Sequence, residues 1–582
     1  MPQEVCVRRA EGFTPHAFRI HSAGVQSDRD AAGLGRWGAV FLLVLLVSAE
    51  LRAAPAVSAT PARSAAPSGR SANVAPARLV VALVFDQLGS DTLLRHLSWL
   101  DPGGAIAQAI AQGVFLERSV YPYASTLTAP GHVAIHTGAS PSQSGIDNNS
   151  RWDETQGRAL GIVDDPRRLV FGRERDGVTV GPGQLRVPTV AAQLKAETGG
   201  AGRVVSLSIK DRSAVLSVGA AADLVLWFDS KLGAFTSSSV WGPALPAWVG
   251  RYQVAHPLQA LLTPWLPLSK EKYQARLGPD AAPGEGDYYG LGTTFPHGWE
   301  HVSKSWSALG CTPMLSEYLV GLADAAVTEQ GLGLDDVPDL LALSISGTDC
   351  AGHVFGPDSW EYVDHLVRAD RAAGQWLTRL AKRLPLSVVI TSDHGVARLP
   401  ERTPAPSGRI SSPPFERQIE AALVKKFGAG PWLSGGLTPF VYLSARARQH
   451  PRADEILETA LAVLRAQPGV REAWAVRDVR GWAQAADPWR RALALGVAPG
   501  NGADLLFVPL PNYPYELGEP LGKGTNHGSP YIYDREVVVL AWGKGVPHLR
   551  SSEPVDQLRV AATLARLLGI AAPAQAVPQP LF

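Results

Sequence analysis

Residues 79–86 read LVVALVFD, an unbroken apolar run that ends in an aspartate. An apolar run of this length, rich in valine and leucine, is typical of a strand buried on both faces of a parallel sheet. Asp86 then follows the strand directly at its C-terminal end. Because open α/β sheets place their sites beyond the carboxyl ends of the strands, this stretch predicts both the fold class and the edge of the sheet that carries the chemistry.

Similar apolar runs recur along the chain and alternate with helical patterns. Further strands are predicted at 204–209, 223–227, 340–345, 387–391, 504–508 and 537–542, and helices at 104–112, 189–197, 316–330, 359–384 and 418–427. This alternation indicates an α/β fold with a mostly parallel central sheet and helices on both faces. Residues 228–310, rich in Trp, Gly and Pro, are interpreted as long loops over the site.

Composition divides the 582 residues into three parts. Residues 1–54 contain a short apolar run at 37–49, preceded by arginines and followed by small residues. The run is shorter than the roughly 20 residues that span a bilayer, so we interpret 1–54 as a signal peptide, with an uncleaved anchor as the alternative. An Ala, Ser and Pro-rich linker follows at 55–76. The catalytic domain is expected over 77–582, with residues 400–500 as an inserted cap subdomain, and the protein is expected to be periplasmic or secreted.

The net charge bears on possible partners, and the cysteine content bears on a possible disulfide. The formal net charge is +1, which gives no indication of a nucleic-acid partner. Of three cysteines, Cys6 lies in the leader, which leaves Cys311 and Cys350. A disulfide between these two is allowed in an exported protein, and two free buried thiols are equally compatible with the sequence.

Three short motifs and Asp86 supply residue types that bind zinc. The candidate ligands are Asp86, Asp349 and His353 in DCAGH, Asp393 and His394 in DHG, and His527 in NHGS. Three aspartates and three histidines suffice for two ions with three protein ligands each, which leaves a position open for substrate and so indicates a catalytic site. The four-residue spacing of Asp349 and His353 places both on one helix face.

The segment ASTLTAPGHVAIHTG at 124–138 contains a candidate nucleophile. Pro130 favours the first turn of a helix, so Thr128 lies at the helix start. Its hydroxyl is there either as a plain N-cap or as a nucleophile that attacks phosphorus. Ser125 and Thr126 are weaker candidates. His132 and His136 form an H-x-x-x-H pair without the following glutamate of a zinc protease, so we interpret both as structural.

Two cations and one amide could bind phosphoryl oxygens. Lys210 and Arg212 follow a predicted strand, and in an extended segment residues two apart share a face. An arginine grips a phosphoryl group with two parallel hydrogen bonds, and a lysine adds a point charge. Asn149 could donate an amide hydrogen bond. Each of these motifs alone would be interpreted as an ordinary turn or solvated loop.

Together the motifs resemble those of the alkaline phosphatase superfamily. The resemblance covers about residues 78–545 and is closest to the type I phosphodiesterase/nucleotide pyrophosphatase branch and its phosphate-irrepressible, PafA-type alkaline phosphatases. It rests on VFDQ at 84–87, TLTAPGH at 126–132, GIDNN at 145–149, SIKDR at 208–212, TDCAGHVFGP at 348–357, TSDHG at 391–395 and TNHGSPYIYD at 525–534. It implies one zinc ion held by Asp349, His353 and His527, and another held by Asp86, Asp393 and His394. Thr128 would be the nucleophile, and Asn149, Lys210 and Arg212 would hold the phosphoryl oxygens.

The resemblance also implies a reaction. Diesterases of this branch lack the K-x-R pair, and a monoester carries one more negative charge on the transferred group, so Lys210 and Arg212 favour monoesters. The expected activity is a zinc-dependent alkaline phosphatase that acts on small phosphate esters through a phosphothreonine intermediate. A phosphodiesterase or nucleotide pyrophosphatase, and a silent binding protein on the same fold, are the alternatives. Cys350 departs from the pattern inside a ligand motif, and we expect it to point away from the metals.

Overall fold

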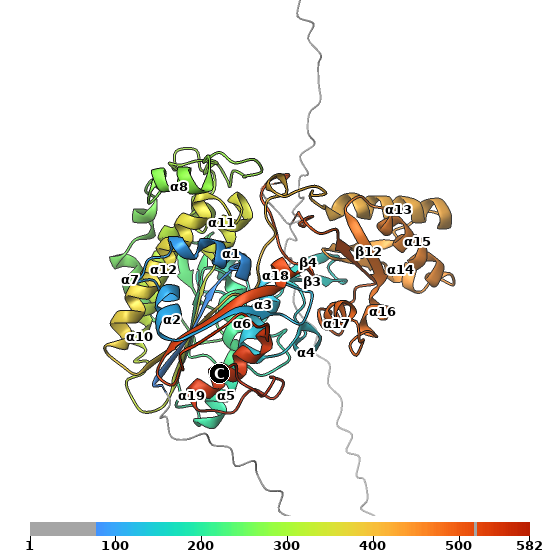
Figure 1. Ribbon diagram of the computed structural model, residues 1–582. Helices are drawn as coiled ribbons and strands as arrows, with labels where there is room; N and C mark the ends of the chain where they lie inside the picture. The colour runs from blue at the N-terminus through green and yellow to red at the C-terminus, as the bar shows by residue number, and fades with distance from the viewer. Residues whose placement is uncertain (1–76, 517–520) are drawn as a thin grey trace, which may run out of the picture. The chain divides into compact units, whose positions relative to one another are not determined.

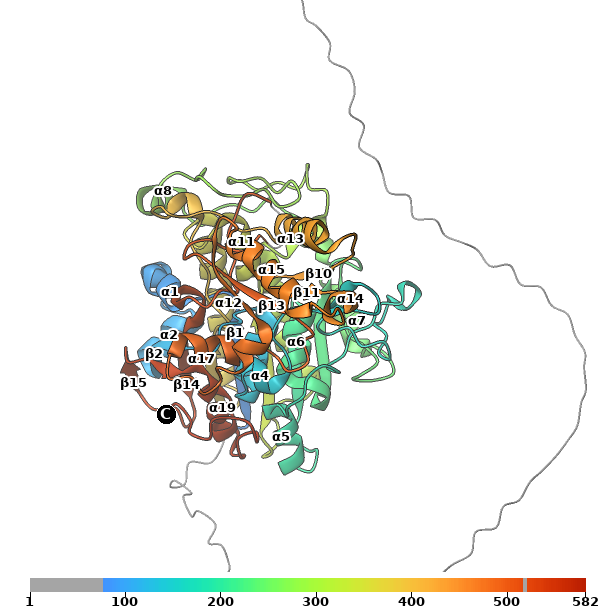
Figure 2. The ribbon, with the colours of Figure 1, turned by 90° about the vertical axis from the view of Figure 1, so that its right-hand side faces the viewer.

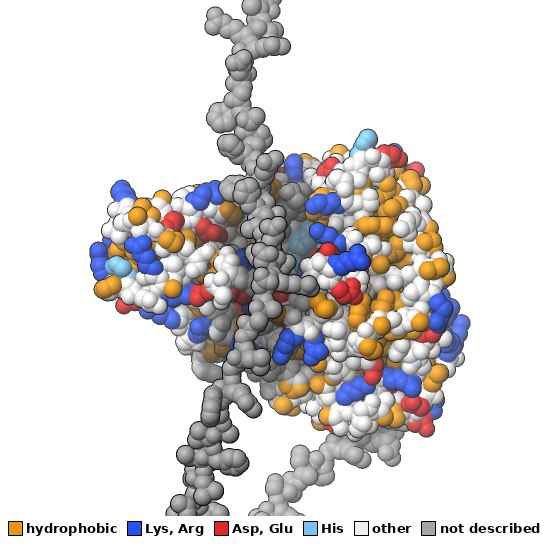
Figure 3. Space-filling model, turned by 180° about the vertical axis from the view of Figure 1, so that it is seen from behind, with side chains coloured by type: hydrophobic (Ala, Val, Ile, Leu, Met, Phe, Trp, Pro, Cys, Tyr) orange, Lys and Arg blue, Asp and Glu red, His pale blue; other side chains and the backbone are white. Residues whose placement is uncertain are grey.

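The computed structural model describes residues 77–516 and 521–582, all within one compact unit. The predicted leader and linker, residues 1–76, lie outside the described residues. Within the described part, no helix combines the length and the apolar character needed to cross a bilayer. Figure 3 shows acidic and basic side chains interspersed on one face of the molecule, in keeping with the net charge of +1.

The central sheet confirms the predicted fold class. Strand β1 (Leu79–Phe85) pairs in parallel with β8 on one side and β9 on the other. The order across the sheet is β15 (Leu549–Ser551), β2 (Val114–Val120), β14 (Glu536–Gly543), β9 (Leu386–Thr391), β1, β8 (Asp339–Ile345), β5 (Val204–Ser208), β6 (Leu224–Asp229) and β7 (Ala234–Thr236), with β16 (Val555–Asp556) paired to β2. Only β14 and β7 run antiparallel to their neighbours on this path.

Helices cover both faces of the sheet, as the unbroken apolar strands require (Figures 1 and 2). Alternate side chains of β1 point into two different hydrophobic cores. The core on one face includes α1 (Ser90–His96), α2 (Ala105–Gln112), α7 (Ala247–Ala255), α10 (Pro313–Glu329), α11 (Gly347–Phe355) and α12 (Trp360–Ala381). The core on the other face includes α3 (Thr128–Thr137), α5 (Val190–Glu197), α6 (Asp211–Val218) and α19 (Val560–Leu568).

A second sheet lies in the C-terminal half of the chain. Its order is β10 (Leu433–Leu437), β11 (Phe440–Leu443), β13 (Leu505–Pro509) and β12 (Val470–Ala475), and every pairing is antiparallel. Helices α13 (Ser412–Phe427) and α15 (Ala453–Arg465) share its core, and α16 (Val476–Arg480) and α17 (Pro488–Leu495) belong to another. The strand predicted at 504–508 exists as β13, but its assignment to the parallel sheet was wrong, because an apolar run indicates burial without indicating the partner strand.

Residues 228–310 are more ordered than the predicted long loops. They contain β7, α7, α8 (Lys270–Leu277) and α9 (Ser305–Leu309). The buried carboxylate of Asp364, on α12, anchors this segment by accepting hydrogen bonds from Trp265 Nε1 at 2.8 Å, Leu268 N at 2.6 Å and Tyr273 Oη at 3.0 Å. Short helices interrupted by proline and glycine leave no long periodic pattern, so the sequence did not indicate them.

Candidate metal centre and active site

The structure brings all six candidate metal ligands together beyond the C-terminal ends of β1, β8 and β9. Asp86 follows β1, Asp349 and His353 lie on α11 directly after β8, Asp393 and His394 follow β9, and His527 comes from the loop before β14. Within the described residues, two groups could each hold an ion, Asp86 with Asp393 and His394, and Asp349 with His394 and His527. The ligand atoms of each group lie within 4.8 Å of one another.

His353 and His394 differ from the expected division of ligands. His353 Nε2 lies 3.1 Å from Asp349 Oδ1, as the four-residue spacing on a helix predicts, but its side chain is 26% exposed. His394 lies between the two groups, and its ring stacks on that of His527 with centroids 3.5 Å apart. The six residues therefore form one continuous cluster, in which His394 contacts both halves.

The three histidines present the same ring nitrogen to the cluster. Because a backbone carbonyl can only accept a hydrogen bond, each Nδ1 that contacts one carries a proton, and Nε2 is the nitrogen that faces the cluster. The three bonds run from His353 to Thr525 O at 3.0 Å, from His394 to Gly395 O at 3.0 Å and from His527 to Thr126 O at 2.7 Å. Nε2 atoms oriented in this way beside carboxylates fit a zinc centre.

The electrostatics of the cluster also fit bound cations. Burial, reinforced by Asp393, raises the pKa of Asp86 to about 6. Burial and the neighbouring His527 hold the pKa of His394 well below its usual range, which keeps the imidazole neutral. Asp86 Oδ1 is buried and accepts no hydrogen bond within the described part of the chain. The neutral imidazole of His394, crowded carboxylates and an oxygen without a donor form a donor set that a divalent cation would satisfy.

Thr128 is the first residue of α3, and the N-cap is Leu127. The N-cap alternative for Thr128 is therefore wrong, and its hydroxyl does not cap the helix. Thr128 is 1% exposed, and its Oγ1 lies 3.3 Å from Lys210 Nζ and 3.5 Å from His394 Nε2. The hydroxyl consequently faces the metal cluster.

The neighbouring hydroxyls and histidines have other partners. Ser125 Oγ donates to Asp147 O, and Thr126 Oγ1 donates to Ser529 O at 2.9 Å. His132 Nδ1 bonds Thr128 O, and His136 Nδ1 bonds His132 O, both at 2.9 Å. His132 also lies 3.2 Å from Asp393 Oδ2, so it packs against the cluster without joining either group of candidate ligands.

The candidate phosphate-binding residues line one cavity of about 440 Å³ together with Thr128, Asp349, His353 and His527. Lys210 Nζ lies 2.8 Å from Asp86 Oδ2 and 2.5 Å from Asp349 Oδ2. Burial alone would lower the pKa of Lys210, but these two carboxylates outweigh it, so the pKa is raised and the ammonium persists. Asn149 Oδ1 accepts from Ala129 N at 2.8 Å, which leaves the amide NH₂ as its donor group.

The conformation expected around Lys210 and Arg212 was wrong. Lys210 is the N-cap of α6 and Arg212 lies in the first turn of that helix, so the two residues do not share an extended segment. They nevertheless line the same cavity, because the N-terminus of α6 lies at its edge. A strand that ends at a helix N-terminus brings backbone N–H groups as well as cations to an anion site.

Gln87 is a site residue that sequence reasoning missed. Its side-chain Nε2 donates to Asp349 Oδ1 at 2.7 Å, and its backbone N–H donates to Asp393 Oδ1 at 3.1 Å. Its φ of 71° lies in the left-handed region, which is uncommon for glutamine. A Cβ on Gly352 would lie 1.7 Å from Gln87 Oε1, so glycine in α11 makes room for this side chain. The only signal in the sequence was a polar residue directly after Asp86.

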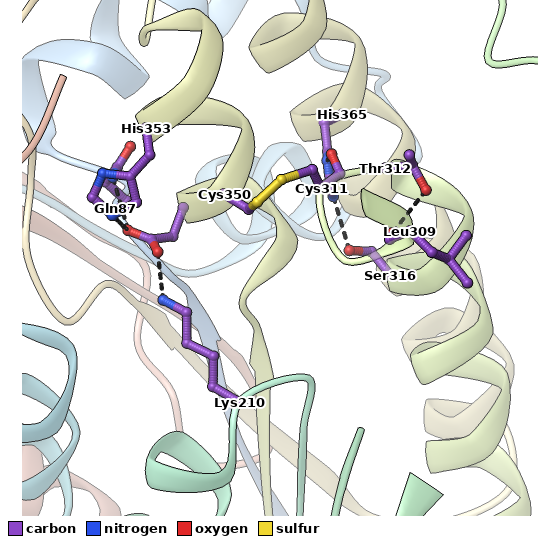
Figure 4. The surroundings of a disulfide bond; sticks show 10 residues. Gln87, Lys210, Leu309, Cys311, Thr312, Ser316, Cys350, His353 and His365 are labelled. Atoms are coloured by element: carbon purple, nitrogen blue, oxygen red, sulfur yellow. Dashed lines mark hydrogen bonds and ion pairs between the residues drawn. A yellow bond between two sulfur atoms is a disulfide. The ribbon is translucent and has the colours of Figure 1, made fainter. Parts of the chain in front are cut away.

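A disulfide joins Cys350 to Cys311, with Cα atoms 4.9 Å apart. Cys350 follows Asp349 on α11, and Cys311 precedes α10. Figure 4 shows the bond directed away from Lys210 and His353, toward Ser316 of α10 and His365 of α12. Of the two states left open by the sequence, the structure has the disulfide, and the expectation that the Cys350 sulfur points away from the cluster holds.

Comparison with known proteins gives relatives that match nearly the whole chain. Alkaline phosphatase PafA of Elizabethkingia meningoseptica is 28% identical over 520 residues, covering 87% of this chain and 94% of that protein. Alkaline phosphatase PhoV of Synechococcus elongatus is 28% identical over 522 residues, covering 88% and 93%.

A match to a solved structure and a match to a protein family agree with these two relatives. The crystal structure of wild-type alkaline phosphatase PafA matches with a TM-score of 0.80 at 27% identity, covering 88% of this chain and 99% of that chain. Residues 80–456 match the family described as "Type I phosphodiesterase / nucleotide pyrophosphatase". Since this match covers more than half of the chain and includes five of the six candidate ligands, the chain belongs to the type I phosphodiesterase/nucleotide pyrophosphatase family.

Proposed function

We propose that this protein is a zinc-dependent alkaline phosphatase that hydrolyses small phosphate monoesters through a phosphothreonine intermediate. The observation that carries the proposal is the Thr128 hydroxyl, which does not cap its helix and lies between Lys210 Nζ and His394 Nε2 beside the ligand cluster. Similarity to proteins named alkaline phosphatase over most of their length supports it.

The proposed cofactor is a pair of zinc ions. Asp86, Asp393 and His394 would hold one, and Asp349, His353 and His527 would hold the other; the position of His394 between both groups supports a closely spaced pair. Bound zinc would supply Lewis acidity at the oxygens that gain negative charge. The chain itself supplies three imidazoles whose Nδ1 atoms are held by backbone carbonyls, which directs Nε2, the atom that would bind metal, toward the cluster.

The proposed reaction consists of two displacements at phosphorus, the first by the Thr128 hydroxyl and the second by water. Thr128 Oγ forms a bond to phosphorus while the bond from phosphorus to the ester oxygen breaks, and the hydroxyl proton ends on the released alcohol. Water then cleaves the phosphothreonine, which restores the hydroxyl and releases inorganic phosphate. Lys210, Arg212 and Asn149 NH₂ line the same cavity as Thr128 and would hold the phosphoryl oxygens.

Two cations at the phosphoryl position favour monoesters over diesters. A monoester dianion carries one more charge on the transferred group than a diester, so the ammonium of Lys210 and the guanidinium of Arg212 stabilise its transfer more strongly. Both residues line the cavity that Thr128 faces, which supports this preference. Phosphodiester hydrolysis on the same scaffold remains the competing function, since the family description names it.

Thr128→Ala tests the covalent step on zinc-loaded enzyme, with Thr128→Ser as the variant that keeps a hydroxyl. We expect a loss of at least about 10³-fold in kcat on p-nitrophenyl phosphate for alanine and partial activity for serine. Full turnover by Thr128→Ala would rule out the phosphothreonine. Faster hydrolysis of bis-p-nitrophenyl phosphate than of the monoester by the wild type would favour the diesterase, and no turnover of either would favour a binding protein.

We further propose that the protein is exported, with residues 1–54 as its leader and 55–76 as a linker, and that residues 400–500 form a cap subdomain. The Cys311–Cys350 disulfide supports an oxidising compartment. The separate antiparallel sheet and core support the cap, and β13 extends it beyond residue 500.

A further inference from the structure

We propose that Tyr288 and Tyr289 form a subsite for phosphate monoesters whose leaving group carries a planar aromatic ring. The proposal rests on the proposed phosphatase function and adds the class of leaving group. Both tyrosines line the cavity of about 440 Å³ that contains Thr128, Lys210 and Arg212. A cavity of this size, within the range that holds drug-sized ligands, offers room beyond the transferred phosphoryl group.

The two rings form an aromatic corner in the cavity. Their centroids are 4.4 Å apart and their planes are inclined by 44°, so they do not form a parallel stack. Such a corner can present both ring face and ring edge to a flat guest, the two arrangements that aromatic pairs prefer. Leu127, Val354 and Pro514 add apolar surface to the same cavity. An alkyl alcohol would gain less from this surface than a flat ring.

Backbone hydrogen bonds fix this corner to the segments that carry the candidate metal ligands. Gly286 N–H donates to Val354 O at 2.8 Å, which ties residues 284–289, here called the tyrosine loop, to α11 just after His353. Gly524 N–H donates to Gly284 O at 2.7 Å, which ties the same loop to the segment that carries His527. The rings therefore keep a fixed position relative to the reacting phosphoryl group.

Tyr289 occupies a backbone conformation that a bulky residue rarely adopts. Its φ is 58°, in the left-handed region that favours glycine. Ser303 N–H donates to Tyr289 O at 2.8 Å, and Lys304 Nζ lies 4.2 Å from the centre of its ring. The surrounding contacts thus hold a strained tyrosine at the cavity wall, and strained residues of this kind concentrate at ligand-binding positions.

Tyr288 is close enough to the cluster to respond to its charge. Burial raises the pKa of Tyr288 to about 12, with contributions from Tyr289 and from the carboxylate of Asp349. Its ring also packs against the main hydrophobic core. The phenol therefore stays neutral at alkaline pH, and the ring remains an apolar surface under the conditions where the enzyme would work.

The test compares substrates that share a phosphoryl group and differ in the alcohol. The variants are Tyr288→Ala and Tyr289→Gly, the second of which removes the ring and also relieves the left-handed backbone. Substrates are phenyl phosphate, adenosine 5′-monophosphate and glycerol phosphate. We expect kcat/KM on at least one aromatic substrate to fall about 10-fold, the loss of roughly one aromatic stacking contact, and to change less than about 2-fold on glycerol phosphate. The inhibition constant of phenylphosphonate, divided by that of methylphosphonate, should rise by a similar factor in these variants.

The outcomes distinguish small aryl groups from nucleobases as occupants of the subsite. They also distinguish failure of the subsite from failure of the proposed phosphatase function. Loss on phenyl phosphate alone assigns the subsite to small aryl groups, and loss on the nucleotide as well assigns it to nucleobases. Equal changes on all three substrates, or none, would overturn the subsite while leaving Thr128-dependent turnover in the wild type. If the proposed function fails, the wild type itself lacks that turnover. Tyr252→Ala is the matched control, because this half-buried tyrosine of α7 lies outside the cavity lining.

Discussion

Gln87 connects the two halves of the candidate metal centre with one side chain and one backbone N–H. It donates to Asp349 from its amide and to Asp393 from its backbone, and it does so from a left-handed conformation. A hydrogen bond to a ligating carboxylate fixes the orientation of that carboxylate. The strain at Gln87 is therefore offset by contacts to both candidate groups, so this residue should influence metal binding without touching the metal.

Gln87→Ala should weaken zinc binding by about 10- to 100-fold, because it frees Asp349 Oδ1 and leaves the left-handed backbone without the amide contact. The measurement is competition with a chromophoric chelator. Gln108→Ala, on α2 and hydrogen-bonded to Gly103 O and Thr378 Oγ1, serves as the control. Zinc affinity in Gln87→Ala equal to that of the wild type would contradict a positioning role.

Glu285, buried in the tyrosine loop, should make stability depend on pH. Burial, reinforced by Glu361, raises the pKa of Glu285 to about 8, although the Ala282 N–H and Arg402 act in the opposite direction. The unfolded chain therefore releases this proton first as pH rises from about 4.5, and folding stability falls until about pH 8, where the folded state is also ionised.

Glu285→Gln should remove that penalty while keeping an acceptor for Ala282 N–H. We expect an unchanged free energy of unfolding at pH 4 and, at pH 9, a gain on the order of 2 kcal/mol that raises Tm. Thermal unfolding at both pH values measures it, with the exposed Glu300→Gln as the control. An increase of equal size at pH 4 would show that ionisation is not the cause.

Among the elements, α11 contributes two candidate metal ligands and one disulfide cysteine within only nine residues. It begins two residues before Asp349, places His353 one turn later and is joined to the segment before α10 through Cys350. The disulfide therefore constrains the helix that presents two candidate ligands (Figure 4). Its closure spans a sequence separation of 39 residues.

Removing this disulfide should lower both stability and zinc affinity. The chain-entropy relation for a loop of this length gives about 4 kcal/mol, and measured losses commonly fall in the range of 2–4 kcal/mol. The comparison is Tm and zinc affinity of the wild type with and without reductant, and of Cys311→Ser/Cys350→Ser. Reductant should leave the double variant unchanged, and a double variant with wild-type Tm would refute the contribution.

At the scale of the whole molecule, the candidate ligands come from four segments between Asp86 and His527 that meet at one edge of the central sheet. Binding of an ion by these segments adds a link between distant parts of the chain that the unfolded state lacks. Metal binding should therefore stabilise the entire compact unit, not only its own loops.

Chelation should lower the Tm of the whole protein in a single transition. At a free zinc concentration 1,000-fold above the dissociation constant, the expected stabilisation is about 4 kcal/mol per ion. Calorimetry with and without chelator measures the difference. Thr128→Ala should show the wild-type difference because it removes no proposed ligand, whereas His394→Ala should show a smaller one; an identical shift in His394→Ala would argue against its place in the centre.

The sequence was most informative where local pattern and position in the fold agree. Strand β1 is where 79–85 predicts it, and the four-residue spacing of Asp349 and His353 gave their contact, because both follow from backbone periodicity. The sheet to which β13 belongs depends on which strands pair, and the helix start at Lys210 depends on capping. Periodicity specifies neither. Gln87 and Tyr289 have left-handed backbone angles, which no side-chain pattern reports.

The carbonyl partners of the three imidazoles have a consequence for how the protein acquires its ions. Thr126, Gly395 and Thr525 hold the rings by hydrogen bonds that involve no metal, so the Nε2 atoms already face the cluster. We therefore expect loading to require no ring rotation, with an uptake rate set by the loss of water from the arriving ion. A chain that reaches its destination empty would then mature simply by meeting the ion there.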